Sequence, residues 1–498
     1  MYTLGYDIGS SSIKAALLNL ETGKVEADAF SPRSEMPITA LRAGWAEQDP
    51  DMWWKNLRIA TAEVLSDSGI KKDSIIAVGI SYQMHGLVII DKNHQVLRPS
   101  IIWCDSRAVE IGRKAFSLIG AEKCLRSLLN SPGNFTASKL RWVKENEPEL
   151  YGKIHAFMLP GDYIAMRLTG EAATTLSGLS EGILWDFSSG SIASFLLHEY
   201  GIDADLIPPL TPTFGEQGRL ERRAAQELGL PEGIPVTYRA GDQPNNALSL
   251  NVMEPGEIAA TAGTSGVVYG VSDTLKYDHA SRVNSFAHVN HTAEANRIGV
   301  LLCINGAGIA NSWIRRMTGQ QSVDYARLNE LAATAAAGSD GAVVLPFGNG
   351  AERMLENRSI GAHILHVQFN THSQAHLIRA VQEGIAFAFK YGIDIMHEID
   401  IKPLVIRAGL ANLFLSPIFT ETLAETAGVN IELYSTDGAQ GAARGAALGV
   451  KYFTSRQEAF KGLERLRTIE PHASRSAEYS ELYQKWSTAL NQILQFKG

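Results

Sequence analysis

Residues 6–12 read Tyr6-Asp7-Ile8-Gly9-Ser10-Ser11-Ser12, and a related stretch, Thr261-Ala262-Gly263-Thr264-Ser265-Gly266, follows half a chain later. Each copy follows one apolar run and precedes another, which predicts the tight turn of a β-hairpin. Glycine lets backbone N–H groups approach phosphate oxygens closely, and the Ser and Thr hydroxyls add donors. Asp7 has the charge to help hold a Mg²⁺ ion that bridges phosphates. Two such turns facing one another would hold one nucleotide.

Either turn alone is ordinary hairpin chemistry, because Asp, Gly and Ser are common turn residues. The duplication is what favours a phosphate-binding function. Neither copy matches the G-x-x-x-x-G-K-[ST] loop or the G-x-G-x-x-G dinucleotide motif, which argues against those two nucleotide folds. The pattern predicts instead a phosphate clamp that is divided between two domains.

Composition limits the class of protein and of partner. The 498 residues, 45% hydrophobic and 20% charged, suffice for two globular domains. A net charge of −8 without a Lys/Arg block argues against nucleic acid or an anionic membrane and favours small-molecule partners. Three widely spaced cysteines (Cys104, Cys124, Cys303) indicate neither a disulfide framework nor a zinc site. No secretory signal or membrane span is visible, so we expect a cytoplasmic protein, either monomer or homodimer.

The order of elements also repeats. Three short strands are expected within residues 1–30, and a second meander begins near residue 257 after a boundary at 245–257. We therefore expect an N-terminal domain at 1–247 and a C-terminal domain at 248–498, and the sequence does not decide which domain the last helix joins. Between and after the meanders we expect helices at 50–66, 309–317, 325–336, 373–398, 417–427, 439–453 and 478–496, and strands at 75–81, 87–91, 404–407 and 430–434.

Asp242 is the candidate base. It follows Gly241 at the end of a strand-like segment, close to the expected domain boundary. In phosphoryl transfer to an alcohol an Asp commonly accepts the hydroxyl proton. The alternative is that Asp242 only caps a helix over residues 243–250. The neighbouring phosphate turns favour the first interpretation.

A polar loop between two apolar strands carries Gln83, Met84 and His85, which we expect to be exposed at one sheet edge and to suit a polyhydroxylated ligand. The alternative is a turn with a core Met and a satisfied His. Trp103 to Arg107 is either another pocket wall or an Asp/Arg ion pair at a helix start. The histidines between residues 363 and 376 fit no familiar metal-site spacing, so no metal is expected there.

These residues resemble the FGGY family of carbohydrate kinases over essentially the whole chain. Asp7 to Ser11 look like its first phosphate loop, Gly263 to Ser265 like its second, and Gly241-Asp242 like the segment that bears its catalytic base. Gln83 to Gly86 is similar to the sugar-binding motif of the branch that phosphorylates D-xylulose. Lys139 to Val143 looks like part of the first family signature. Three residues, Asn134, His366 and Ala408, depart from the usual motifs.

The resemblance implies an α/β, two-domain actin/hexokinase-like (ribonuclease-H-like) fold with an interdomain catalytic cleft. It also implies ATP and Mg²⁺, with ATP mainly on the C-terminal domain and the sugar mainly on the N-terminal one. The implied substrate-binding residues are Gln83, Met84, His85, Trp103 and Asp242, and the implied cofactor-binding residues are Asp7 (also toward the metal), Gly9, Ser10, Ser11, Gly263, Thr264, Gly308, Gly409 and Asn412.

The activity that the resemblance implies is ATP-dependent phosphorylation of D-xylulose at its terminal O5, with Asp242 accepting or orienting the hydroxyl proton. Another ketopentose, a sugar acid or a polyol is the alternative acceptor, and the loop at residues 82–86 discriminates among them. A non-catalytic sugar- or nucleotide-binding regulator is the alternative of another class. Both phosphate turns and Asp242 are retained, which argues against it.

Overall fold

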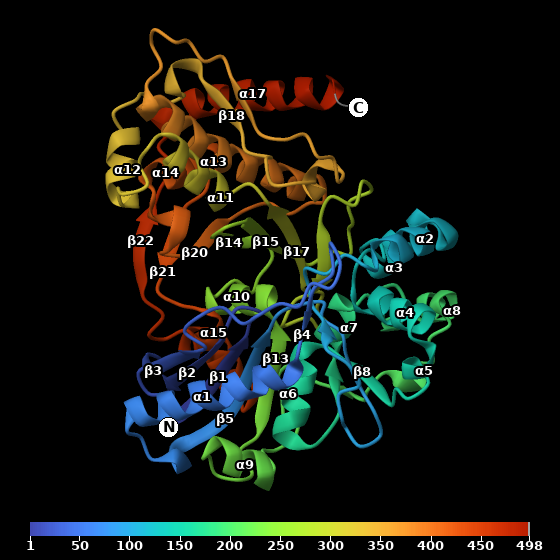
Figure 1. The fold of residues 1–498 in the computed structure, drawn as a ribbon. Helices are drawn as coiled ribbons and strands as arrows, with labels where there is room; N and C mark the ends of the chain where they lie inside the picture. Colours follow the sequence, from blue (N-terminus) through green and yellow to red (C-terminus); the bar gives the residue numbers. More distant parts are fainter. Residues whose placement is uncertain (497–498) are drawn as a thin grey trace.

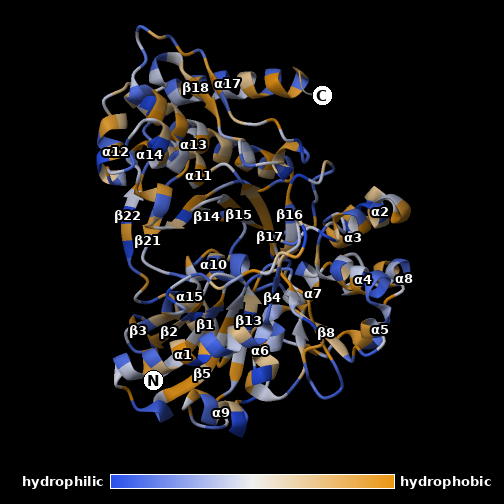
Figure 2. Cartoon of the chain, in the orientation of Figure 1, coloured by the Kyte–Doolittle hydropathy of each residue, from blue (hydrophilic) through white to orange (hydrophobic). Residues whose placement is uncertain are grey.

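The protein folds into two α/β units, each built on its own sheet (Figure 1). The structure is a computed structural model and describes residues 1–496. Inner strands of both sheets are strongly apolar, as Figure 2 shows for residues 75–82 and 298–304. The strand order of the first sheet is β13 (Val236–Gly241), β5 (Ile75–Tyr82), β1 (Tyr2–Ile8), β2 (Ile13–Asn19) and β3 (Val25–Ser31). The strand order of the second sheet is β16 (Asn284–Ala287), β17 (Ile298–Ile304), β15 (Gly266–Ser272), β14 (Glu257–Ala262), β20 (Val405–Gly409), β21 (Ile431–Tyr434) and β22 (Arg465–Ile469).

The two sheets share one plan. In the first, β1, β2 and β3 form an antiparallel meander, and β5 and then β13 extend it in parallel beside β1. In the second, β14, β15 and β17 form the meander, and β20 and β21 extend it in parallel beside β14. The predicted duplication is therefore confirmed, and both phosphate turns lie at the same point of the plan, between the first two strands.

Helices cover both sheets and confirm most of the expected ones. Helix α1 (Pro50–Ser68) is capped by Asp49, whose side chain accepts from the Asp51 N–H at 3.0 Å, and Pro50 occupies its first position. The helix expected over 325–336 ends earlier, at Ala332. The remaining helices that match expected segments are α11 (Gly308–Met317), α12 (Tyr325–Ala332), α13 (Gln374–Glu398), α14 (Pro417–Ala427), α15 (Gly438–Gly449) and α17 (Ala473–Phe496).

The last helix belongs to the second unit. Helix α17 packs against α13 and α14, and Trp486 is buried, with its indole N–H donating to the Val344 carbonyl at 2.8 Å. This decides what the sequence left open.

A smaller, largely helical lobe extends from the first unit (Figure 1). It is inserted between β5 and β13, and it carries the loops that were expected to bind sugar. The elements between β5 and β13 are β6 (Val88–Ile90), β7 (Ser100–Ile101), α2 (Val109–Ile119), α3 (Ala121–Leu128), α4 (Thr136–Asn146), α5 (Pro148–Tyr151), β8 (Ala156–Met158), α6 (Pro160–Thr169), β9 (Thr174–Thr175), α7 (Leu176–Glu181), β10 (Trp185–Asp186), β11 (Ser191–Ile192), α8 (Ser194–Tyr200), β12 (Leu210–Thr211) and α9 (Arg222–Leu228). Of these, α6 and α9 pack against α1 of the first unit and not in the lobe.

Short elements complete the chain. The strand expected at 404–407 corresponds to β20, and one 3₁₀ turn separates it from α14, the helix expected at 417–427. The short elements not yet named are β4 (Glu47–Gln48), α10 (Asp242–Ser249), β18 (Val343–Leu345), β19 (His363–Leu365), α16 (Arg456–Ala459) and the 3₁₀ turns Lys72–Ser74, Ala204–Leu206, Ser339–Gly341, Arg353–Leu355 and Asn412–Leu415.

Helix α15 crosses between the units. It follows β21 of the second sheet, yet it packs on β1, β5 and β13 of the first. A Cβ on Gly5 would overlap the Ala439 carbonyl oxygen, and a Cβ on Gly79 would overlap that of Ala442. The strands therefore admit the helix backbone only because these positions have no side chain.

Hydrogen bonds hold this close contact. The Thr3 hydroxyl donates to the Ala443 carbonyl at 2.8 Å, and the Thr237 hydroxyl donates to the Ala446 carbonyl at 2.9 Å. Both threonines are buried in the first sheet. The contact thus joins a helix from the second half of the chain to the first unit. A division of the chain at residue 247 therefore does not separate the two units completely.

Two absences complete the description. Within residues 1–496 no helix is both long enough and apolar enough to cross a membrane. The three cysteines, Cys104, Cys124 and Cys303, are all free thiols.

We predict that Gly5→Ala lowers the free energy of unfolding by about 1–3 kcal/mol, because the added methyl must push α15 off the sheet. Gly152→Ala is the matched control: Gly152 has φ −64° and ample space, so alanine there should be neutral or slightly stabilising. Thermal unfolding of both variants measures the difference. Equal midpoints would show that the helix does not depend on this contact.

Candidate active site

The second phosphate turn docks directly on helix α11. The Gly308 N–H donates to the Gly263 carbonyl at 2.9 Å, and the Ile309 N–H donates to the Thr264 carbonyl at 3.0 Å. A Cβ on Gly308 would overlap the Gly263 carbonyl oxygen, so glycine is required there. The positive N-terminal end of α11 therefore lies beside the turn, an arrangement that favours an anion.

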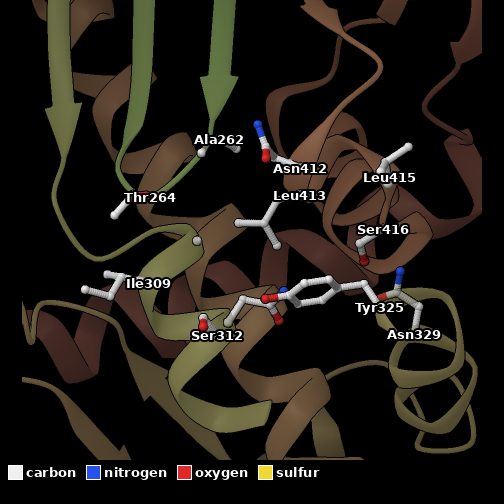
Figure 3. A pocket seen from close by; sticks show the side chains of 13 residues that line it. Ala262, Thr264, Ile309, Ser312, Tyr325, Asn329, Asn412, Leu413, Leu415 and Ser416 are labelled. Atoms are coloured by element: carbon white, nitrogen blue, oxygen red, sulfur yellow. The ribbon is translucent and has the colours of Figure 1, made fainter. Parts of the chain in front are cut away.

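A cavity of about 430 Å³ opens next to this turn, entirely within the second unit (Figure 3). Apolar side chains alternate with amides and hydroxyls around it, as suits the flat base and the ribose of a nucleotide. Four predicted residues (Gly263, Thr264, Gly308, Asn412) line it. Residues that the sequence analysis did not identify complete the lining: Ala262, Ile309, Asn311, Ser312, Tyr325, Asn329, Leu413, Leu415 and Ser416.

A second cavity of about 290 Å³ adjoins the first, since Ala262 and Asn412 line both. It lies where the two units meet and brings together Asp7, Asp242 and Gly409, all of them predicted. Residues from both units form its wall; those not predicted are Lys14, Gln243, Asn246, Leu250, Ala260, Thr261, Ala411, Phe414, Thr436, Asp437 and Gly438.

Asp7 is a partly buried carboxylate with two partners in the first sheet. The Ser81 hydroxyl donates to its Oδ1 at 2.8 Å, and Lys14 stands opposite it on β2. Burial raises the pKa of Asp7; Lys14 and the Ser81 hydrogen bond oppose this, and Asp437 raises the pKa further. Within residues 1–496 no three His, Cys, Asp or Glu side chains form a metal cage. Asp7 therefore suits a cation that keeps most of its water or phosphate ligands.

Asp242 is the first residue of α10, and Gly241, not Asp242, occupies the cap position. Asp242 is therefore not the cap residue itself, although the backbone N–H of Gln243 hydrogen-bonds to its carboxyl in the first turn of the helix. Burial raises the pKa of Asp242 to about 7, and the charge of Asp7 adds to the increase. A carboxyl group with this pKa is ionised in part at neutral pH and can accept a proton.

The loop expected to bind sugar is buried, which corrects the prediction of an exposed sheet edge. Gln83 and Met84 are 2% and 4% exposed, and Met84 lies against Gly241. His85 is in the left-handed region, with φ 60°. The Lys139 ammonium group holds the loop by donating to the His85 carbonyl at 2.7 Å. Met84 thus brings the loop against Gly241, the residue before Asp242.

His85 is fixed as a neutral ring. Its Nδ1 lies 3.0 Å from the Glu181 carbonyl, which can only accept, so Nδ1 carries the proton. Burial, and to a smaller extent the nearby charge of Lys139, lowers the pKa of His85 to about 3. Nε2 is then a hydrogen-bond acceptor. The sequence analysis missed Glu181 altogether and quoted Lys139 only as part of a motif.

Trp103 meets the first phosphate turn. Its side chain is 53% exposed, and its indole N–H donates to the Ser10 hydroxyl at 3.3 Å. Gly9, Ser10 and Ser11 line neither of the two cavities. The alternative for the following residues is confirmed, since Arg107 and Asp105 form a buried ion pair at 2.7 Å.

Comparisons with known proteins agree with this geometry. The model of the FGGY family of carbohydrate kinases matches residues 2–249 with its N-terminal domain and 258–449 with its C-terminal domain. The chain belongs to this family. It is similar to the xylulose kinase of Klebsiella pneumoniae, at 31% identity over 89% of this chain and 88% of that protein.

Two further relatives extend the comparison. The L-xylulose/3-keto-L-gulonate kinase of Escherichia coli (strain K12) is 29% identical over 97% of this chain and 96% of that protein. The crystal structure of xylulose kinase from Rhodospirillum rubrum superimposes with a TM-score of 0.90 at 26% identity, covering 100% of this chain and 99% of that one. The actin/hexokinase-like two-domain fold expected from the sequence is thereby confirmed.

We predict that Asp242→Asn stabilises the protein at high pH. Because the folded-state pKa lies above that of the unfolded chain, the folded protein binds more protons between about pH 4 and 7, and Asp242 makes stability fall as pH rises through this range. At pH 8 the variant should gain about 1–4 kcal/mol, and below pH 4 it should gain nothing. Thermal unfolding across pH measures this; Asp28→Asn, at an exposed residue of β3, is the control. An equal gain at every pH would contradict the assignment.

Proposed function

We propose that the protein transfers the terminal phosphoryl group of ATP to the O5 hydroxyl of D-xylulose. The observation that carries the proposal is the junction of the two cavities at Ala262 and Asn412: a cavity large enough for a nucleoside opens beside the cavity that contains Asp7 and Asp242. The similarity to a protein named xylulose kinase supports the choice of sugar.

Asp242 acts as the base in this proposal. Phosphoryl transfer leaves the protein mainly with positioning the reactants and with accepting the proton of the attacking hydroxyl. With a pKa near 7, Asp242 is basic enough to take that proton and still ionised in a large fraction of molecules at neutral pH. Lys14, across from Asp7, offsets negative charge in the same cavity.

The residues present fit Mg²⁺ and ATP. A Cβ on Gly409 would meet no atom closer than 4.0 Å, so the backbone there is open to a ligand. Gly263 and Thr264 would bind the phosphoryl group being transferred, and Asp7 would hold the metal through its water shell. Gly308, whose N–H donates to the Gly263 carbonyl, would line the phosphate site at the positive end of α11. Bound Mg·ATP supplies the phosphoryl group and the cation that neutralises charge as it transfers.

The sugar site is assigned to the buried loop and to Trp103. Gln83 and His85 would hydrogen-bond hydroxyl groups of the sugar, His85 as an acceptor through Nε2, and Met84 would cover a carbon face. Trp103 would close the site from the side of Ser10. These assignments place the sugar above Gly241, next to Asp242.

Closure of the units completes the proposed site. Gly9, Ser10 and Ser11 face the nucleotide only if the N-terminal domain (1–247) closes on the C-terminal domain (248–498), and closure would exclude water that otherwise hydrolyses ATP. The proposed partners are sugar and ATP, without nucleic acid or membrane, in the cytoplasm and as a monomer or homodimer.

We predict that D-xylulose gives the highest kcat/KM in a panel that also contains L-xylulose, D-ribulose, L-ribulose, D-gluconate and glycerol, measured by ADP release with Mg·ATP. L-xylulose is the competitor to watch, because a 29% identical relative is named for it. Asp242→Asn should lower turnover by roughly 10²–10⁴-fold and leave sugar binding intact. If another acceptor leads, the sugar assignment fails; if the variant keeps its turnover, Asp242 is not the base.

A further inference from the structure

One buried side chain connects three walls of the larger cavity. Gln382 lies on α13 and is 0% exposed. Its amide nitrogen donates to Asn311 Oδ1 at 3.3 Å and to Asn329 Oδ1 at 2.8 Å, while its Oε1 accepts from the Ser416 hydroxyl at 2.9 Å. The three partners belong to three different elements, α11, α12 and the cap of α14, and all three line the cavity.

These contacts determine the direction of both asparagine amides. Each Oδ1 accepts a hydrogen bond from Gln382, so in both residues the NH₂ group remains free to donate to another partner. Within residues 1–496 neither Nδ2 has a hydrogen-bond partner, although both side chains line the cavity and Asn311 is only 6% exposed. The cavity is therefore supplied with two donors, which suit the ring nitrogens and carbonyl oxygens of a nucleobase.

We propose that Gln382 is a positioning residue for nucleotide binding: it turns the amides of Asn311 and Asn329 so that both present donors to the base of the nucleotide. This inference rests on the proposed function, which assigns the cavity to ATP. Gln382 does not touch the nucleotide; it acts through the two asparagines. The surrounding helices α11, α12 and α14 all pack on α13, which fixes its position.

The test compares Gln382→Leu with the wild-type protein by calorimetric titration with ADP and by the KM values for ATP and the sugar. Leucine keeps the size but removes the hydrogen bonds, so the dissociation constant for ADP should rise about tenfold, or about 1.4 kcal/mol. The KM for the sugar should stay within about twofold, because the sugar site lies in the other unit. Gln374→Leu, at an exposed position at the start of α13, makes the same chemical change and should alter neither constant.

A second variant covers the case in which leucine prevents folding. Gln382→Glu keeps size and polarity but loses the donating NH₂ group, so both asparagine amides must turn and present oxygens to the base. It should also weaken ADP binding about tenfold. Asn329→Ala should cause a similar loss, and combining it with Gln382→Leu should add little, because both changes remove one coupled arrangement.

ADP binding within twofold of wild type in the folded Gln382 variants would overturn the inference, and so would an equal rise in the ADP and sugar constants. The titration needs no sugar and no turnover. If the wild-type protein binds ADP but phosphorylates no sugar of the panel, only the proposed function is contradicted. If the wild-type protein is active and the Gln382 variants bind ADP normally, only this inference is contradicted.

Discussion

The whole site depends on the direct backbone contact between α15 and the first sheet. Because Gly5 and Gly79 have no side chains, the backbone of α15 lies closer to the sheet than any other residue would allow. Buried threonine hydroxyls donate hydrogen bonds to its carbonyl groups. The helix begins at Gly438, where a Cβ would overlap the Asp7 carboxylate. The contact therefore places the start of α15 beside Asp7 at the end of β1, and both line the cavity where the two units meet.

Electrostatics follow from this packing. Bringing Asp437 and Asp242 close to Asp7 in a partly buried space raises the pKa of Asp7 and of Asp242, since burial and like charges both disfavour ionisation. Lys14 is the cation that the chain itself contributes to the lining of this cavity. A metal ion would offset the negative charge of such a site. The same surroundings make Asp242 more basic than an ordinary aspartate. Burial among like charges thus underlies both properties that a phosphoryl-transfer site needs.

Much of this was predictable from sequence because it is encoded locally. The paired turns, the strands on either side and the cap of α1 at Asp49 each follow from a few adjacent residues. The crossing of α15 to the other sheet was not predictable, because the Ala/Gly-rich helix and Gly5 are more than 400 residues apart and nothing local pairs them. The burial of the loop at Gln83 and Met84 was missed for a related reason. Helices α4 and α7, which hydrogen-bond to the next residue of this loop, come more than 50 residues later in the chain.

The first cavity, assigned to the nucleotide, shows the same limit. Gly263, Thr264 and Gly308 were found through their motifs, but Asn329 and Ser416 were not, because ordinary polar residues on helices carry no signal until the fold gathers them. Gln382 is a stronger case: in sequence it is one of many polar residues in a long helix. Only its three partners reveal that it organises the cavity.

The central claim is that burial beside Asp7 makes Asp242 a base with a pKa near neutrality. The dependence of kcat/KM for the sugar on pH, between about pH 5 and 9, tests it most directly. The account predicts that kcat/KM rises tenfold per pH unit at low pH and levels off with an apparent pKa of about 7. A profile that is flat across this range would contradict it.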